Sequence, residues 1–476
     1  MNMEAFMVSS KILADIDSFI SANQEELFRN IGRLVAINSI NGPEQPNAPF
    51  GKGPAEALYK TLEIAEELGL STRNCEDRIG YAFIKGSDSE AEKYLATITH
   101  VDIVPAGNGW NSDPFTMIER DGYILGRGVI DDKGPSILCL YALKYFRNRG
   151  INPKYEIRAL IGSNEEIGMS DVEYYLDHYP APVFCFSPDA DFPLVNGEKG
   201  IWHAVLTSKL RNSKIEKIWG GLAANAVPDR AEAIICLEDG SNGLSLSHDD
   251  RIETLIEGNA LRLIAYGIGG HASLPAGTEN AIGILASYIL ENHLASDEEE
   301  SFLLAVMKLH SASDGSGLGI QASDGLFDPL TAVGGVIGMT EDGRMYQTID
   351  IRYPTSTTGA ILSDTILSQV GSCAELTVTN DTVPFYMSLD NPAVQVCINA
   401  YNSVTGENAV PFTIGGGTYA RHFPNATSFG PEHNDRKMPD WCGSMHGANE
   451  AASKADFLEA LKVYIVALLE LEGLDF

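Results

Sequence analysis

The chain has 476 residues, of which 44% are hydrophobic and 21% charged, and its formal net charge is −32. This composition is that of a globular protein with a large core, and it excludes a disordered chain. The acid excess argues against binding to nucleic-acid phosphates and to anionic membrane surfaces. At roughly 150 residues per domain, the length predicts about three domains.

The cysteines and the N-terminal residues indicate the compartment. There are seven cysteines and no CxxC pair, so neither a disulfide framework nor a thiolate zinc site is expected. Residues 1–19 lack a basic region followed by an apolar run, and no stretch approaches the ~18 apolar residues of a membrane helix. We therefore expect a cytoplasmic protein without a membrane anchor.

The first third of the chain alternates between helical and strand patterns. The predicted helices begin near Ser9 and span about 54–69 and 133–149, and the predicted strands are 81–84, 95–101, 155–161 and 183–186. This alternation predicts an α/β domain with a doubly wound, mostly parallel sheet. Its ligand site should lie beyond the carboxyl ends of the strands.

From about residue 193 to residue 390, strand patterns dominate. Helical patterns occur near 279–294 and 358–369, and residues 333–352 predict a hairpin that turns at 341–343. The chain ends in an amphipathic helix at about 454–471. These patterns predict one catalytic domain split into residues 1–192 and 392–476. An α+β domain at 193–391, large enough for two subdomains, is inserted in it.

Four short motifs place histidines and carboxylates at positions where such a sheet binds ligands. THVD carries His100 and Asp102, GRGVIDDKG carries Asp131 and Asp132, NEE followed by SPD carries Glu165, Glu166 and Asp189, and SMHG carries His446. Each motif alone has an ordinary explanation. A histidine at a strand end is usually a satisfied polar residue, an Asp-Asp pair before a helix is usually a cap, and a Glu-Glu pair is usually a solvated loop.

Taken together, the motifs indicate a metal site. The candidate ligands are His100, Asp131, Glu166, Asp189 and His446. Two imidazoles and three carboxylates suit a pair of zinc-like ions that share one bridging carboxylate. Glu165 is left over as a general base, and Asp102 is spaced to receive the other imidazole N–H of His100.

With these motifs, the chain resembles the two-zinc metallopeptidase family that includes aminoacylase, glutamate carboxypeptidase, acetylornithine deacetylase and succinyl-diaminopimelate desuccinylase. The runs HVDIVPAG, GRGVIDDKG, NEEIG and MHG carry the resemblance, which covers nearly the whole chain. The runs WNSDPF, SPDADFPLVNGEKG and IGGGTYAR are similar to those of the PepV-type dipeptidase branch. The resemblance implies an exopeptidase-type catalytic domain, and it makes the inserted domain a lid.

The resemblance also implies a role for each candidate ligand. Asp131 would bridge two divalent cations, with Glu166 and His446 on one ion and His100 and Asp189 on the other. The Asp131–Asp132 peptide would be cis. Zinc suits these ligands best, and manganese would also accept the carboxylates.

Further residues match motifs that bind substrate in the family. His271, in GIGGHASLPA, would stabilise the oxyanion, and Arg352 would bind the substrate carboxylate. The other substrate-binding candidates are Asn225 in GGLAANAVPD, Gly416 and Gly417 in the glycine run, and Arg421. Without the resemblance, Asn225 would be a turn residue and His271 a surface histidine in a Gly-rich loop. Arg352 would be a solvated strand end, and the glycine run a flexible turn.

We therefore expect a metallopeptidase that hydrolyses dipeptides with a free carboxylate, through a water held between the metals. In the PepV-type branch the extra half of the lid takes the place of a partner's lid, which implies a monomer. The nearest alternative is an N-acyl-amino-acid deacylase with the same chemistry. A non-catalytic metal-binding protein is disfavoured by Glu165 and His271, and a two-metal phosphoesterase by the scarcity of clustered basic residues in the lid.

Overall fold

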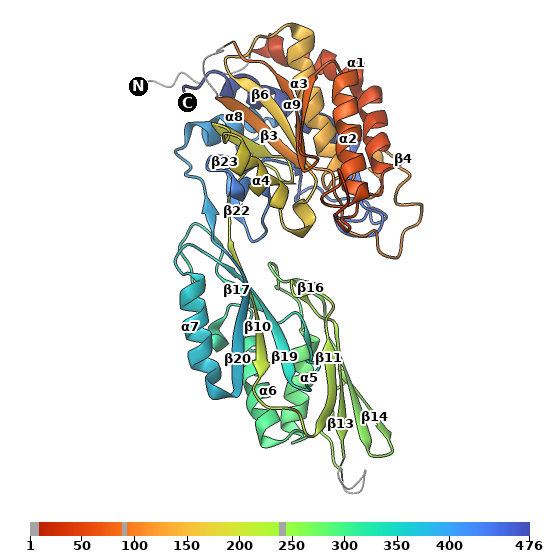
Figure 1. The fold of residues 1–476 in the computed structure, drawn as a ribbon, viewed down its shortest axis with the longest axis vertical. Coiled ribbons are helices and arrows are strands. Elements are labelled where there is room, and N and C mark those ends of the chain that lie inside the picture. The colour runs from red at the N-terminus through yellow and green to blue at the C-terminus, as the bar shows by residue number, and fades with distance from the viewer. Residues whose placement is uncertain (1–8, 88–92, 238–243) are drawn as a thin grey trace. The chain divides into compact units, whose positions relative to one another are not determined.

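The structure is a computed structural model that describes residues 9–87, 93–237 and 244–476. The chain divides into two compact units (Figure 1). The first unit takes its described residues from Met1–Asn196, Tyr386–Phe412 and Gly417–Phe476, and the second from Gly197–Phe385 and Thr413–Gly416. The predicted boundaries, after residues 192 and 391, fall near the first two crossings between the units. The return of Thr413–Gly416 to the second unit has no counterpart in the prediction.

The first unit is built on a sheet whose order is β1-β2-β6-β3-β7-β23-β9-β21, with β22 beside β9. Its central strands β6, β3, β7 and β23 run parallel, whereas β1, β2 and β9 are antiparallel to their neighbours. Every residue of β3 is buried, as expected for a strand covered on both faces. The strands are β1 Ser71–Cys75, β2 Ile79–Ile84, β3 Tyr94–His100, β6 Glu156–Gly162, β7 Phe184–Ser187, β9 Val195–Glu198, β21 Phe385–Tyr386, β22 Phe412–Ile414 and β23 Ala426–Ser428.

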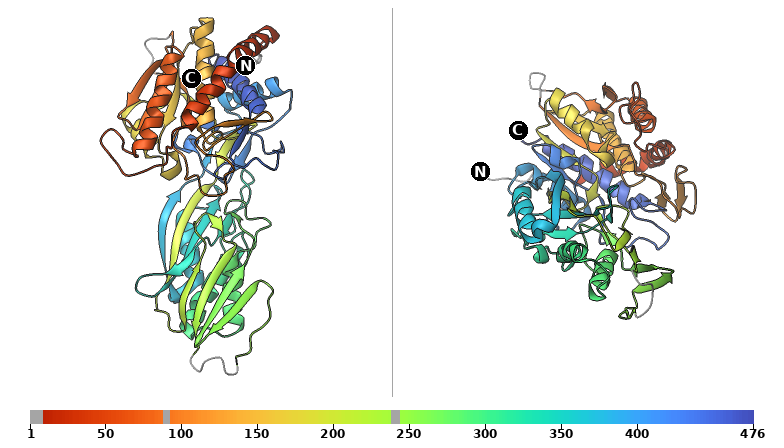
Figure 2. Two further views of the ribbon diagram at one scale, coloured as in Figure 1. Left: turned by 90° about the vertical axis from the view of Figure 1, so that its right-hand side faces the viewer. Right: turned by 60° about the horizontal axis from the view of Figure 1, so that its bottom comes forward.

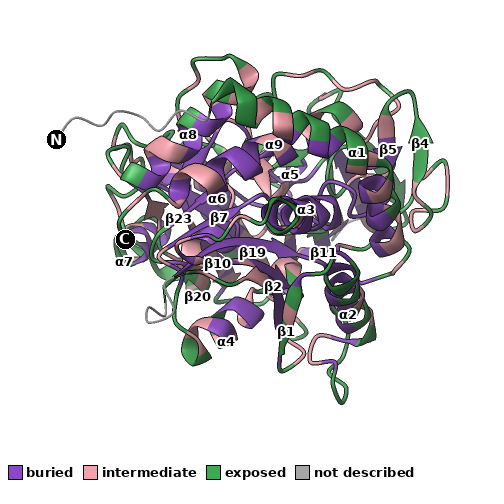
Figure 3. Cartoon of the chain, turned by 90° about the horizontal axis from the view of Figure 1, so that it is seen from above, coloured by how far each residue is buried: buried purple, intermediate pink, exposed green. Residues whose placement is uncertain are grey.

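Helices cover this sheet. The helices of the first unit are α1 Ser10–Val35, α2 Lys52–Glu67, α3 Lys133–Arg149, α4 Ser170–His178, α8 Pro392–Thr405 and α9 Lys454–Leu471. Figure 3 shows α8 and α9 on one side of β7 and β23, and α4 on the other. α3 is almost wholly buried because it packs against α1, α9 and the central strands. The predicted doubly wound α/β domain is thereby confirmed. α4 and α8 were not predicted.

Two small sheets and two 3-10 turns bring distant segments together in the same unit. β24 Pro431–Glu432 runs parallel to β8 Ala190–Asp191. β25 Ala451–Ser453 pairs with β5 Tyr123–Leu125, which pairs with β4 Ile118–Arg120. The turns are η1 Glu165–Ile167 and η4 Tyr419–His422. The C-terminal segment is thus held beside residues that follow β7 and residues that precede α3.

The second unit is built on a large antiparallel sheet, in the order β14-β15-β13-β11-β18-β19-β10-β20, with β17 beside β19 (Figures 1 and 2). Both halves of the inserted segment contribute strands to it. The predicted hairpin at 333–352 corresponds to β18 and β19. The strands are β10 Gly200–Ser208, β11 Ile215–Gly220, β13 Arg230–Cys236, β14 Ile252–Glu257, β15 Ala260–Tyr266, β17 Thr331–Val333, β18 Ile337–Met339, β19 Met345–Tyr353 and β20 Ala374–Thr382.

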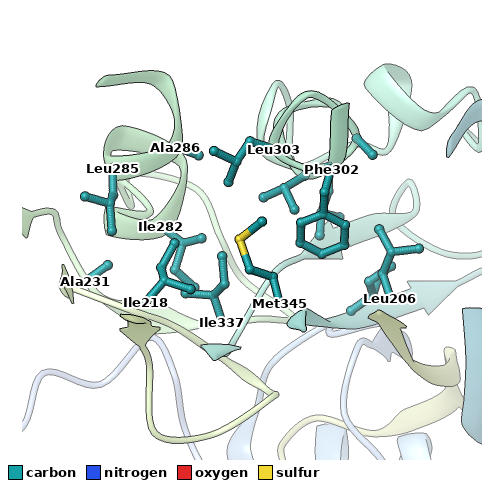
Figure 4. Close-up of a cluster of buried hydrophobic side chains, with 14 of the residues drawn as sticks. Leu206, Ile218, Ala231, Ile282, Leu285, Ala286, Phe302, Leu303, Ile337 and Met345 are labelled. Carbon is teal, nitrogen blue, oxygen red and sulfur yellow. The ribbon is translucent and has the colours of Figure 1, made fainter. Parts of the chain in front are cut away.

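Helices pack on this sheet to form the second core. They are α5 Ala281–Glu291, α6 Asp297–His310 and α7 Gly359–Val370, with the short turns η2 Ser316–Leu318 and η3 Gly371–Cys373. Figure 4 shows Ile282, Leu285, Phe302 and Leu303 from α5 and α6 above Met345 and its neighbours on the strands. α5 and α7 match the predicted helices, whereas α6 was not predicted. Among the described helices of both units, none is long and apolar enough to cross a membrane.

Candidate metal centre

The sheet of the first unit brings the predicted ligands to one edge. His100 is the last residue of β3, Glu165 and Glu166 follow β6 directly, and Asp189 comes just after β7. These three strands are parallel neighbours, so their carboxyl ends meet at the same edge. The other two candidates, Asp131 before α3 and His446 before β25, join this cluster from loops.

Asp131 lies between the two histidines. Its Oδ1 is 2.9 Å from His100 Nε2, and its Oδ2 is 2.8 Å from His446 Nε2. Glu166 Oε2 lies 3.4 Å from His446 Nε2, and Asp189 Oδ2 lies 3.6 Å from His100 Nε2. The two oxygens of Asp131 therefore face the two halves of the cluster, which is the arrangement a bridging ligand needs. The peptide bond from Asp131 to Asp132 is cis, as the resemblance implied.

The cluster fits divalent cations. Ligand atoms about 2.0–2.2 Å from one ion lie about 3–3.5 Å from each other, which matches the spacings found. His100 Nε2 and Glu166 Oε1 are buried without a hydrogen-bond partner among the described residues, which suits atoms that bind an ion. Within this cluster, two groups of described side chains could each hold an ion: His100, Asp131 and Glu166, and also His100, Asp132 and Asp189. Asp132 was not a predicted ligand.

The electrostatics of the cluster also call for positive charge. Although burial lowers the pKa of the His100 imidazole, Asp102 and Asp131 raise it well above its usual range. Asp131 and Glu166 raise the pKa of His446 to about 11. The carboxylates thus draw protons onto the histidines, and divalent cations would supply the same compensation.

Glu165 stands in the position expected of a general base. It is on η1, next to Glu166, and it belongs to neither of the two ligand groups. Burial raises the pKa of the Glu165 carboxyl well above its usual value, and the carboxylates of Asp189 and Glu166 raise it further. A buried carboxyl beside a cluster of candidate metal ligands is a candidate for proton transfer.

Asp102 supports more of the site than the sequence predicted. His100 Nδ1 lies 3.1 Å from the backbone carbonyl oxygen of Asp102 and 3.4 Å from its Oδ1. The same carboxylate accepts hydrogen bonds from the backbone N–H groups of Glu165, at 3.1 Å, and Glu166, at 3.2 Å. Asn41 Nδ2 donates to Asp102 Oδ2 at 2.7 Å. One buried carboxylate therefore fixes both the histidine and the turn that carries the two glutamates.

Sequence reasoning missed Glu450, which supports the Asp131 loop. This fully buried carboxylate accepts hydrogen bonds from Arg127 Nη1, at 2.6 Å, and from the backbone N–H groups of Gly128 and Ile130, at 3.0 and 3.1 Å. Arg127 Nη2 in turn donates to the carbonyl oxygen of His446 at 3.1 Å. The pair thus ties together the two loops that contribute ligands. The signal available was its place in MHGANE, four residues after His446.

Asp171 is a second supporting carboxylate that the sequence did not reveal. Its Oδ2 accepts hydrogen bonds from the Tyr419 hydroxyl at 2.5 Å and from the backbone N–H groups of Ser163 and Asn164 at 2.6 and 3.0 Å. Burial raises the pKa of Asp171 to about 6. The group fixes the segment that leads from β6 into Glu165.

Four of the predicted substrate-binding residues belong to the second unit: Asn225, His271, Arg352 and Gly416. Asn225 and His271 lie together, because β12 Ala226–Val227 pairs with β16 Gly270–His271 and the Ala272 N–H donates to the Asn225 carbonyl oxygen at 2.9 Å. His271 is exposed, and its Nδ1 lies 2.7 Å from Ser273 Oγ.

Arg352 is engaged within the second unit. It donates to both oxygens of Asp350, at 2.7 and 3.0 Å, and its Nη1 donates to the carbonyl oxygen of Gly415 at 3.1 Å. Asp350 thus occupies one edge of the guanidinium. Gly416 also belongs to this unit, whereas Gly417 and Arg421 belong to the first. The substrate roles of these residues stay predictions.

The fold and the ligand cluster define a metal-dependent hydrolase of the α/β class. The sequence matches Peptidase family M20/M25/M40 over residues 96–470, so the chain belongs to this family. The predicted family and the predicted class of enzyme, a metallopeptidase, are thereby confirmed.

Similar proteins match along almost the whole chain. YtjP of Bacillus subtilis (strain 168) is 34% identical over 465 residues, and the Beta-Ala-Xaa dipeptidase of Lactobacillus delbrueckii subsp. lactis is 31% identical over 465 residues. Both matches cover 94% of this chain and 97% of the relative. Human carnosine dipeptidase 1 shares the fold with a TM-score of 0.59 at 18% identity, covering 97% of this chain and 99% of that structure. The dipeptidase Dug1p of Saccharomyces cerevisiae has a TM-score of 0.59 at 13% identity, over 98% and 100% of the two chains.

Proposed function

We propose that this protein is a metal-dependent dipeptidase that cleaves dipeptides with a free carboxylate. The observation that carries the proposal is the position of Asp131 between His100 and His446, with the Glu165 carboxyl beside the cluster. Family membership and the 31% identity with the Lactobacillus Beta-Ala-Xaa dipeptidase support the same activity. These relatives favour a dipeptidase over an N-acyl-amino-acid deacylase.

The proposed cofactor is a pair of zinc ions held by His100, Asp131, Glu166, Asp189 and His446. When bound, the ions would polarise the peptide carbonyl and lower the pKa of a water molecule. Imidazole and carboxylate ligands suit zinc, and manganese is the alternative because the set is rich in oxygen ligands. Elemental analysis of protein purified without added metal distinguishes the two.

The remaining roles concern protons and charge. The Glu165 carboxylate takes a proton from the attacking water and passes it to the leaving nitrogen. Asp102 keeps His100 and the Glu165 turn in place. His271 stabilises the oxyanion, and Arg352 binds the substrate carboxylate. Asn225, Gly416, Gly417 and Arg421 complete the proposed substrate contacts.

The test of this proposal is Glu165→Ala, with Glu173→Ala on the exposed face of α4 as its control. Loss of a general base lowers kcat by about 10²–10⁴-fold. We expect that loss for Glu165→Ala on a dipeptide panel, together with an unchanged content of two metal ions. Equal rates for the two variants would refute the mechanism.

We also propose that the enzyme is a cytoplasmic monomer. The enlarged second unit supports the monomer, since its large sheet contains strands from both halves of the inserted segment. Sedimentation equilibrium of the metal-loaded protein would give the mass of one chain, and the mass of two chains would contradict the proposal.

A further inference from the structure

The turn that follows β16 in the second unit lies against the ring of His271. The N–H of Leu274 donates to the carbonyl oxygen of His271 at 3.1 Å, which closes a four-residue turn. This turn brings Ser273 back to the imidazole. The N–H of Ser273 donates to His271 Nδ1 at 3.2 Å, and Ser273 Oγ lies 2.7 Å from the same nitrogen.

The turn is anchored to the rest of the second unit through Ala272, its second residue. Ala272 is 1% exposed and forms a small buried cluster with Val227 of β12 and Val333 of β17. Its N–H donates to the carbonyl oxygen of Asn225 at 2.9 Å. The residues on either side of Ala272 therefore start from a fixed backbone.

A second fixed segment lies close to Ser273. A Cβ atom at Gly415 would be 3.0 Å from the Cβ of Ser273, so the absence of a side chain at Gly415 permits this approach. The carbonyl oxygen of Gly415 accepts a hydrogen bond from Arg352 Nη1 at 3.1 Å. Because Gly415 is itself held, its backbone restricts the movement of the serine.

The two contacts of His271 Nδ1 determine which ring nitrogen carries the proton. A backbone N–H can only donate, so Nδ1 must be the acceptor in its contact with Ser273. The neutral ring then has its proton on Nε2, and the Ser273 hydroxyl also donates to Nδ1. An imidazolium would direct a second N–H at the N–H of Ser273, which is unfavourable. The turn therefore favours the neutral ring with an Nε2–H group.

This tautomer is the one that suits the proposed role of His271. An oxyanion is stabilised best by a hydrogen-bond donor that is oriented before the charge develops. The Nε2–H group is such a donor. With the proton on Nδ1, the ring would present the lone pair of Nε2 to the oxyanion and repel it.

We propose that Ser273 is a positioning residue, which holds His271 as a neutral hydrogen-bond donor with its proton on Nε2. The inference rests on the proposed dipeptidase function and adds a residue to its machinery. It also assigns His271 to hydrogen-bond donation rather than to proton abstraction.

The kinetic test is a double-mutant cycle, with zinc-loaded enzyme and L-alanyl-L-alanine as substrate. Ser273→Ala removes the hydroxyl beside His271. The control, Ser301→Ala, removes an exposed hydroxyl of α6 that donates to the carbonyl oxygen of Asp297 at 2.8 Å. Losing one hydrogen bond to the donor should lower kcat of Ser273→Ala by about 3–10-fold, with KM within about twofold.

The His271→Ala background separates positioning from a general structural role. In that background Ser273→Ala should change kcat by less than about twofold, because the group that it positions is gone. Ser301→Ala should have no larger effect in either background. The inference is overturned if the loss from Ser273→Ala persists without the imidazole, is confined to KM, or does not exceed that of the control.

A spectroscopic measurement separates this inference from the proposed function. Nitrogen-15 NMR of zinc-loaded protein with labelled histidine reports the protonation of each ring nitrogen, and His271→Gln identifies the signals of His271. At about pH 8.5, where an ordinary histidine is neutral, we expect the proton on Nε2. The Nδ1 signal should move in Ser273→Ala and stay in place in Ser301→Ala.

Two NMR results would overturn the inference: a proton on Nδ1 of His271 in the wild type, or an Nδ1 signal that Ser273→Ala leaves unchanged. If the wild type hydrolyses no dipeptide, the proposed function is wrong, and the role of Ser273 is judged on these signals alone.

Discussion

The buried pair of Arg127 and Glu450 should be one of the most sensitive points of the first unit. Both side chains are almost completely buried, at 1% and 0% exposure. Replacing Glu450 with alanine leaves the guanidinium of Arg127 without its counter-ion. It also leaves the backbone N–H groups of Gly128 and Ile130 without acceptors.

The expected loss follows from these contacts. An unpaired buried charge costs about 3–5 kcal/mol, and each unsatisfied buried N–H about 1–3 kcal/mol. These costs are not additive, because relaxation and water entry relieve some of them. We therefore expect Glu450→Ala to lower the free energy of unfolding by at least about 4 kcal/mol, a large share of the 5–15 kcal/mol typical of a domain.

The control is an ion pair of similar length at the surface. Lys454 and Glu119 are 2.5 Å apart, with exposures of 29% and 53%, and such pairs contribute about 0–1 kcal/mol. Urea denaturation can be followed by tryptophan fluorescence, since Trp110 stacks 5.3 Å from the Arg127 guanidinium. Burial and Asp131 raise the pKa of Glu450 to about 7, so the assay should be run above that pH. If Glu450→Ala costs no more than Glu119→Ala, Glu450 does not anchor the Asp131 loop.

Four further predictions concern other parts of the chain. Chelation of divalent cations should abolish turnover and lower the Tm, since ions at 100 times their Kd stabilise the folded state by about 2.7 kcal/mol. Scanning calorimetry with and without added zinc measures the change in Tm. In steady-state kinetics, His271→Ala should lower kcat by about 10²–10³-fold, with a smaller rise in KM. A variant in which KM alone changes would exclude the oxyanion role. Burial lowers the pKa of His310 to about 4, so the unfolded state binds more protons than the folded state between about pH 6.5 and 4. As the pH is lowered through that window, the free energy of unfolding should fall by up to roughly 3 kcal/mol. Urea titrations of His310→Gln should show a flatter dependence on pH. Gly221→Ala places a methyl group 1.9 Å from the Gly335 carbonyl oxygen at a φ of +76°, whereas Gly343→Ala at +83° meets open space; thermal melts should show a clearly larger loss for Gly221.

The fold was predictable wherever local patterns agreed with the final packing. α3 and α9 occur with their predicted bounds, since each has a clear start signal and a long apolar face. α6 was missed although Ser296 and Glu299 form a capping box at its start. Its first turn consists of four consecutive acidic residues, which hide the apolar periodicity that begins at Phe302.

The candidate site was predictable where a ligand lies at the carboxyl end of a strand, as His100 and Asp189 do. The residues that support the ligands were not, because their partners lie far away in the sequence. Glu450 binds groups more than 300 residues before it, and Asp171 pairs with Tyr419. No local pattern distinguishes a buried, hydrogen-bonded carboxylate from a solvated one, since burial depends on the assembled fold.

The separate segment Thr413–Gly416 limits how this enzyme can exchange parts with its relatives. A recombination that transferred residues 197–385 alone would carry over Arg352 and Ser273 but leave Gly415 behind. Gly415 accepts a hydrogen bond from Arg352, and a Cβ atom there would lie 3.0 Å from that of Ser273. Substitutions at these positions should therefore be coupled in evolution. Chimaeras that move both segments together should fold better than those that move one.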